Sequence, residues 1–187
     1  MANKDSAFGL KPIGKVGQNR DNQGLSEYSI AASASAIYFQ DPVEMAATGT
    51  ITVAAASDAL LGSLNGVFFT DATTDKPTYA NHLNASNTAT DIVGFVSDDP
   101  YERFEIQADG ATAAADVGLN ADIVYAAGSS PDYVSKVELQ TSDQKTGTAQ
   151  LRILGISKDP DNNTAGSANV NLVVLINEHQ LKATAGV

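Results

Sequence analysis

The chain has 187 residues, of which 43% are hydrophobic and 18% are charged, a composition that favours a globular domain with a real core over a disordered or fibrous chain. It contains no cysteine, which excludes disulfides, thiolate metal sites and cysteine nucleophiles, and its longest apolar run, residues 172–176, is far too short to span a bilayer. Eleven basic residues against 22 acidic ones give a net charge of −11, which argues against a broad nucleic-acid-binding surface. We therefore expect neither nucleic acid nor membrane as a partner, and the first ten residues lack the apolar stretch of a secretory signal.

Residues 1–24 are predicted to form an extended N-terminal arm. The segment contains four glycines and Pro12, and it shows neither helical spacing nor strict alternation of apolar residues. Residues 1–20 carry a charge of +3, whereas the rest of the chain carries −14. Four apolar residues indicate that the arm docks, either on its own body or on another chain: Phe8, Leu10, Ile13 and Val16. We expect the arm to be separable from a single β domain over residues 25–187.

From residue 25 onward the sequence predicts β-strands. They are expected over residues 25–30, 35–39, 49–54, 91–98, 101–109, 122–127, 132–139, 149–157 and 168–177. Asn65-Gly66 predicts a hairpin turn, because both residues readily adopt positive φ. Gly94 and Gly155 lie inside apolar strands and predict bulges or sharp bends.

Helical signals are weak and limited to residues 111–119 and 177–181. Turn signals recur every ~8–15 residues, which is typical of an antiparallel sandwich or barrel. The predicted fold is all-β: an antiparallel β-sandwich or small barrel, β-tulip or jelly-roll-like, with an extended N-terminal arm.

The sequence shows no set of catalytic residues. The two histidines, His82 and His179, lie far apart, and no G-x-S-x-G motif accompanies them. Asp98 and Asp99 would point to opposite faces of a strand, and Pro100 after them predicts a turn. We therefore expect no catalytic residues; a hydrolase with a hidden Asp/His site is the weaker alternative.

A metal site is not expected either. Residues 159–163 begin like an EF-hand loop, with Asp159, Asp161 and Asn163 at positions 1, 3 and 5. Thr164 then stands where glycine is required, and Val170 stands where the bidentate Glu belongs. The expectation is a chain without metal or cofactor, with a looser calcium site in this turn as the weaker alternative.

The two ends of the chain carry a family resemblance. The opening MANKDSAFGLKPIG resembles the start of a family of virion proteins of tailed phages, common among marine and cyanobacterial phages. Four further blocks are similar: DDPYERFEIQAD at 98–109, ADVGLNADI at 115–123, LRILGISKDPDN at 151–162 and VNLVVLINEHQL at 170–181. Residues 40–90 carry no such resemblance.

The resemblance implies a capsid decoration (cement) protein, made in the host cytoplasm and placed on the outer surface of the virion head. Its partner would be the major capsid protein, and it would be a homo-oligomer, a trimer or alternatively a dimer. The family has no catalytic motif to carry over to this chain. From the residues themselves, the candidates for capsid contact are Lys4, Phe8, Leu10, Lys11, Ile13, Lys15, Val16 and Arg20.

Two other functions remain open. A tail, neck or fibre-associated virion component would differ in copy number and in its place in the particle. A carbohydrate-binding adhesion β-sandwich would need exposed aromatic rings on one face. The scattered candidates for such a face are Tyr79, Tyr125 and Tyr133.

Overall fold

The structure, a computed structural model, describes residues 2–16 and 24–182. Nearly all of its regular structure is β-strand, and the strands pair antiparallel. The predicted all-β class with antiparallel sheets is confirmed. The two weak helical signals correspond to short 3-10 turns, η1 (Ala114–Asp116) and η2 (Gln180–Lys182).

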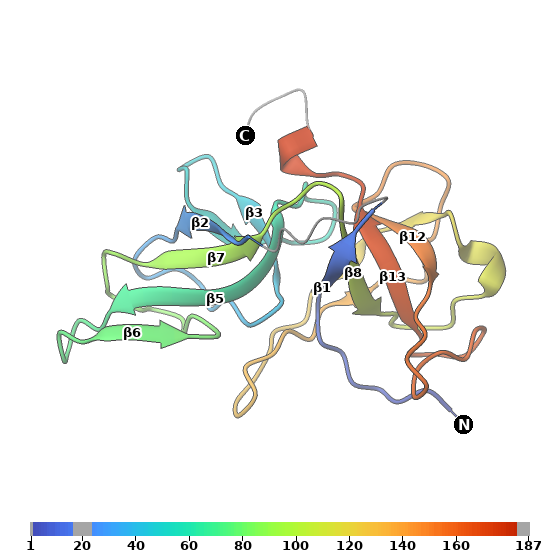
Figure 1. Cartoon of the computed structure of the whole chain (residues 1–187), viewed down its shortest axis with the longest axis horizontal. Helices are drawn as coiled ribbons and strands as arrows, with labels where there is room; N and C mark the ends of the chain where they lie inside the picture. Colours follow the sequence, from blue (N-terminus) through green and yellow to red (C-terminus); the bar gives the residue numbers. More distant parts are fainter. Residues whose placement is uncertain (1, 17–23, 183–187) are drawn as a thin grey trace.

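Two sheets lie next to each other along the longest axis of the molecule (Figure 1). The first, called here the β8 sheet, has the strand order β1 (Lys11–Lys15), β8 (Glu102–Gln107), β13 (Asn171–Ile176), β12 (Leu151–Ile156) and β9 (Asn120–Ala121). The second, called the β5 sheet, has the order β2 (Ser26–Ser29), β7 (Val93–Ser97), β5 (Gly62–Thr70), β3 (Pro42–Met45) and β4 (Ile51–Val53), with β6 (Pro77–Ala80) also paired to β5. A small pair, β10 (Ile123–Val124) and β11 (Glu138–Leu139), completes the fold.

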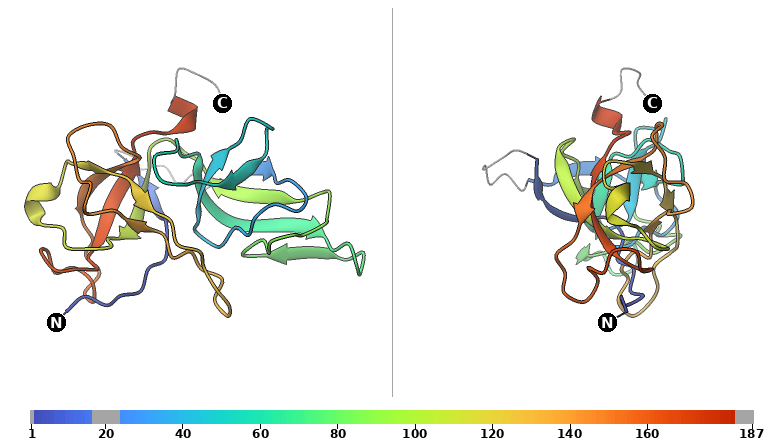
Figure 2. Two further views of the ribbon diagram at one scale, coloured as in Figure 1. Left: turned by 180° about the vertical axis from the view of Figure 1, so that it is seen from behind. Right: turned by 90° about the vertical axis from the view of Figure 1, so that its right-hand side faces the viewer.

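Each sheet has its own cluster of buried side chains. The cluster of the β8 sheet includes Leu10, Phe104, Ile106, Leu151 and Leu172. The cluster of the β5 sheet includes Ile37, Val43, Leu64, Leu83 and Val96. Seen from behind, the two sheets again lie at opposite ends of an elongated molecule (Figure 2). The region from residue 25 onward thus holds two hydrophobic clusters.

The N-terminal segment is extended, but it is built into the molecule. Strand β1 joins the β8 sheet, and Leu10 before it belongs to that sheet's buried cluster. Residues 10–15 therefore form part of a sheet and its core, which differs from the separable arm expected from the sequence. The sequence did not reveal this because the pairing partner, β8, lies about 90 residues further along the chain.

A tight contact between the two sheets surrounds Gly9. The Leu10 N–H donates to the Gln40 carbonyl (2.9 Å), and the Ser63 hydroxyl donates to the Leu10 carbonyl (2.5 Å). Gly9 has φ +76°, and a Cβ at this position would lie 2.3 Å from the Gln40 oxygen and 2.5 Å from the Ser135 Cβ. Only glycine fits there without a shift of the backbone.

The sequence predicted a turn at one glycine and bulges or bends at two others, and the structure agrees with one of these predictions. Asn65 and Gly66 do not form a turn; they lie inside β5, where the register with β7 shifts between Leu64 and Gly66. Gly155 follows a register shift between β12 and β13, as expected for a bulge. Gly94 pairs in regular register, and a Cβ there would meet the Ile51 side chain at 2.8 Å, so this glycine allows close packing and does not mark a bulge.

Candidate docking surface

Strand β1 carries most of the predicted contact residues and lies at the edge of the β8 sheet. It pairs with β8 on one side, with Pro12 opposite Phe104 and Lys15 opposite Glu102. Pro12 removes a backbone donor from this strand, and the register shifts between Pro12 and Gly14. Proline, lysine and a bulge are the features that protect edge strands against pairing with another chain. A partner would therefore contact this strand through its side chains and not by backbone pairing.

The basic residues of the segment are paired within the chain. The three ion pairs are Lys4–Asp161 at 2.5 Å, Lys11–Glu105 at 3.2 Å and Lys15–Asp99 at 2.5 Å. The hydrogen bond between Lys15 and Asp99 raises the pKa of the lysine and lowers the pKa of the carboxyl group. The positive charge expected to attract an acidic shell is thus largely balanced by carboxylates of the same molecule.

Leu10 is not available to a partner. Its side chain is fully buried in the cluster of the β8 sheet, so its prediction as a capsid contact is wrong. Gly9 turns the chain before β1, and the pairing of β1 with the distant β8 places Leu10 in the core, with its backbone bonded to Gln40 and Ser63.

The other apolar candidates remain at the surface. Phe8 is half-buried, and the Lys11 ammonium lies 5.9 Å from its ring centroid. Ile13 and Val16 are 42% and 44% exposed, which is high for large apolar side chains. Arg20, the remaining basic candidate, lies outside the described residues.

Two buried amides hold the first residues of the chain. Asn162 donates from Nδ2 to the Lys4 carbonyl (2.7 Å) and accepts the Lys4 N–H at Oδ1 (3.1 Å). Gln107 accepts the Ser6 N–H at Oε1 (2.8 Å) and donates from Nε2 to the Lys4 carbonyl (2.9 Å). The turn at 159–163, considered above as a calcium loop, therefore positions the N-terminal segment. Within residues 2–16 and 24–182, no group of three His, Asp or Glu side chains is placed to hold a metal ion.

This arrangement gives a first prediction. Asn162→Ala should lower the free energy of unfolding by about 1–3 kcal/mol, because the Lys4 backbone groups lose their buried partner. Urea denaturation measures the change, and trypsin should cleave after Lys4 faster than in the wild type. The control is Asn163→Ala, an exposed neighbour in the same turn. Equal stability and equal cleavage of the two variants would contradict the role of Asn162.

A hollow of about 200 Å³ opens beside β1, between the two sheets. Its lining residues are Pro12, Ile13, Gly14, Lys15, Gly24, Leu25, Asn65, Ser97, Asp99 and Glu102. Glu102 is 8% exposed, accepts the Gly14 N–H (3.0 Å), and has its pKa raised by burial. The carboxyl group therefore fixes the backbone of β1 at the hollow.

Two large apolar side chains line this hollow, and two more belong to residues next in sequence to its lining residues Lys15 and Glu102. Ile13 and Leu25 (39% exposed) line it, and Val16 donates its N–H to the carbonyl of Tyr101 (3.0 Å), which is 61% exposed. We call Ile13, Val16, Leu25 and Tyr101 the β1 patch. Exposed apolar side chains gathered in this way mark interaction surfaces more often than isolated ones do.

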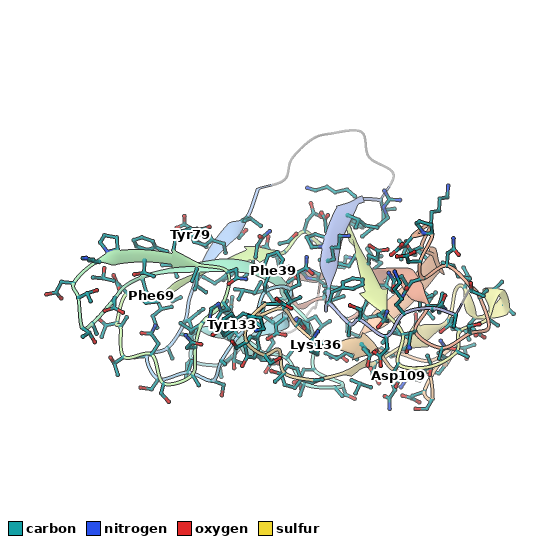
Figure 3. The ribbon with its side chains drawn as sticks, turned by 90° about the horizontal axis from the view of Figure 1, so that it is seen from below. Phe39, Phe69, Tyr79, Asp109, Tyr133 and Lys136 are labelled. Carbon is teal, nitrogen blue, oxygen red and sulfur yellow. The ribbon has the colours of Figure 1, made fainter. Side chains whose placement is uncertain are left out.

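The β5 sheet also has an apolar outer face. Phe69 packs on the buried cluster, whereas the neighbouring Phe68 pairs with Tyr79 on β6 and belongs to the opposite face. Tyr79 is 67% exposed and stacks on Phe95 of β7, with ring centroids 5.3 Å apart. Figure 3 shows Tyr79 and Phe69 on opposite sides of the sheet.

The three tyrosines considered for carbohydrate binding do not share a face. Tyr133 stacks on His82 with centroids 3.8 Å apart and planes 3° apart, and it lies on the other side of the β5 sheet from Tyr79 (Figure 3). Tyr125 is 38% exposed, and burial of its remainder raises its pKa to about 12. A common aromatic platform from these residues is therefore not present.

The histidines serve the packing of the fold. The His82 ring bonds through Nδ1 to Asn81 (2.8 Å), and burial lowers its pKa. His179 is 2% exposed, and its Nδ1 accepts the Leu181 N–H (3.1 Å). Neither ring forms a hydrogen bond with a carboxylate in the part of the chain that the structure describes, so a Ser-His-Asp arrangement is not assembled there.

No protein family, no curated protein and no solved structure matches this chain. Among the residues described, no helix is long and apolar enough to cross a membrane. Sequence reasoning identified Ile13 and Val16 as surface candidates but missed Leu25 and Tyr101, which join them only through the fold. It also missed the stacking of Tyr79 on Phe95; the one available signal was a glycine, Gly66, two residues before a pair of phenylalanines.

Proposed function

We propose that this chain is a non-enzymatic structural protein of a tailed-phage virion, a cement protein that binds the outer surface of the head and stabilises contacts between major capsid subunits. The observation that carries the proposal is the β1 patch. Two of its four residues lie in segments with the family resemblance, Ile13 in the opening block and Tyr101 in the block at 98–109. The two blocks pair directly as β1 and β8.

The patch suits a lasting contact with another protein. Burial of one large apolar side chain contributes roughly 1.5–3 kcal/mol to association, before the costs of ordering are counted. The strand that carries it is anchored by Leu10 and by the amides of Asn162 and Gln107, so little ordering remains to be done on binding. The acidic remainder of the chain would face solvent and keep the particle soluble.

The proposal includes self-association on the head, as a trimer or alternatively a dimer. The support is the resemblance together with the strand edges at β2 and β4 of the β5 sheet. Closed symmetric contacts are the rule among soluble oligomers, and edges of sheets are places that proteins cover.

A charge placed in the patch tests the docking surface. Val16→Asp should weaken binding to undecorated heads at least about tenfold, because burial of an unpaired carboxylate opposes association. The matched control is Val117→Asp, which changes a valine of similar exposure (42%) that is not part of the patch. Binding of purified protein to heads, followed by co-sedimentation, gives the comparison. If Val16→Asp binds like the control, the β1 patch is not the contact.

The position of the chain in intact particles tests the function itself. A reconstruction should show hundreds of copies spread over the head, on the outer surface. A dozen copies or fewer at one vertex would instead indicate a tail, neck or fibre component, and the cement function would be wrong.

A further inference from the structure

A row of side chains crosses the outer face of the β5 sheet. In the register of the sheet, Glu27 on β2 lies opposite Phe95 on β7, and Phe95 lies opposite Gly66 on β5. Side chains opposite each other in this way are about 4.5–5.5 Å apart at Cβ. The third side chain of the row is Tyr79, which comes from β6 and stacks on Phe95. Glu27, Phe95 and Tyr79 thus form one continuous line over the sheet.

Gly66 makes this line possible. It has no side chain between β6 and β7, and a Cβ added there would lie 3.4 Å from the Cε1 atom of Tyr79. The Tyr79 ring therefore extends over the glycine toward Phe95, and the planes of the two rings meet at only 28°. The two rings are therefore stacked, and the outer ring of the stack, that of Tyr79, belongs to a residue that is 67% exposed.

A carboxylate without a cation stands at one end of the row. Glu27 is exposed and has neither an ion pair nor a side-chain hydrogen bond with any described residue. By contrast, Lys4, Lys11 and Lys15 are paired with other carboxylates. With a net charge of −11, the chain has little positive charge of its own to place here. Since no cation among the described residues pairs with Glu27, its carboxylate is open to a cation of a partner.

We propose that Glu27, Phe95 and Tyr79 form a receptor for an arginine side chain of a partner protein. A guanidinium group is planar, stacks on aromatic faces, and offers paired N–H donors that match the two oxygens of a carboxylate. A lysine ammonium could pair with Glu27 but would not stack on the Tyr79 ring as a planar guanidinium does. Tyrosine and arginine are also the residues that carry most binding energy at protein interfaces.

The row is continuous with the surface described above. Ser97, two residues after Phe95 and on the same face of β7, lines the hollow beside β1. In this respect the inference rests on the proposed function: the partner that buries the β1 patch is the major capsid protein, and the arginine belongs to it. The docking surface then has an apolar half beside β1 and an arginine receptor on the β5 sheet.

The receptor can be tested without heads, with N-acetyl-arginine amide as the probe. Stacking and ion pairing at an exposed site predict weak binding, with a Kd of about 10–100 mM. Titration followed by ¹H–¹⁵N NMR should shift the amides of Glu27, Gly66, Tyr79 and Phe95 in a saturable way. The shifts should be smaller with N-acetyl-lysine amide and absent with methyl β-glucoside. Shifts elsewhere only, no saturable shifts, or equal shifts with the glucoside would overturn the proposal.

Two exposed variants connect the receptor to the partner. Glu27→Gln and Tyr79→Ala should each abolish the arginine-induced shifts and weaken head binding about tenfold, while the urea unfolding curve of Glu27→Gln stays that of the wild type.

Heads that bind both variants as tightly as the wild type overturn the inference and leave the proposed function standing. Failure of the wild type to bind heads overturns the proposed function, and the NMR titration still decides the receptor. A dimer in sedimentation that is lost in Arg103→Gln would show that the partner is a second copy, which also overturns the inference.

Discussion

Leu10→Ala should lower the free energy of unfolding by about 2–5 kcal/mol, the usual cost of a large cavity in a core. Leu10 is fully buried and touches the cluster under the β8 sheet, although it lies only ten residues from the start of the sequence. Its backbone also bonds to Gln40, just before β3, and to Ser63 of β5, so the cavity opens where the two sheets meet. Urea denaturation monitored by tyrosine fluorescence and circular dichroism measures the loss.

The control for this variant is Ile13→Ala, three residues further on. Ile13 is 42% exposed, and its truncation should change stability by no more than about 0.5 kcal/mol. An equally small effect at Leu10 would show that the N-terminal segment is dispensable for the fold. A folded, equally stable protein lacking residues 1–16 would lead to the same conclusion.

A second large effect concerns two buried groups with opposite pH dependence. Asp41 is fully buried, accepts the Tyr38 N–H (2.7 Å), and burial raises its pKa to about 6 from 3.8. The folded state therefore holds this proton more tightly than the unfolded state, so Asp41 makes the protein more stable as the pH falls from 6 toward 4. His179 is also buried, and its pKa falls to about 4 from 6.5. It makes the protein less stable as the pH falls from 6.5 toward 4.

Each of these contributions amounts to about 3 kcal/mol over its full range, so they nearly cancel between pH 4 and 6. Asp41→Asn should remove one of them: the variant gains stability at pH 7 relative to the wild type and loses that advantage on acidification. His179→Gln should show the reverse slope relative to the wild type. Urea denaturation at several pH values between 4 and 7.5 gives both curves. Curves parallel to the wild type for both variants would show that neither group is shifted in the folded protein.

Most strands of this fold could be predicted from the sequence, because their signal is local. The alternation of Phe104 and Ile106 with charged residues places β8 correctly, and the apolar run 172–176 places β13. The Asn65-Gly66 pair was misleading for the same reason: a dipeptide that favours a turn gives no information about Tyr79, the side chain that needs the space above Gly66.

The candidate site was predicted less well, because its contacts join distant parts of the chain. Lys11 meets Glu105, and Lys4 meets Asp161, across 94 and 157 residues. Nothing near either lysine in the sequence shows that its charge is balanced. The burial of Leu10 has the same origin, since the pattern around Gly9 and Pro12 is irregular until β8 lies beside it.

The pairing of β1 with β8 also sets an order of events during synthesis on the ribosome. All strands of the β5 sheet lie between residues 26 and 97, so this sheet can assemble as soon as that stretch has emerged. The β8 sheet needs residues up to 176; Gln107, which holds Ser6, lies in β8, and Asn162, which holds Lys4, lies in the segment between β12 and β13. The first residues to be synthesised are consequently among the last to form their native contacts. Leu10 therefore stays without its buried contacts until β8, β12 and β13 have been synthesised.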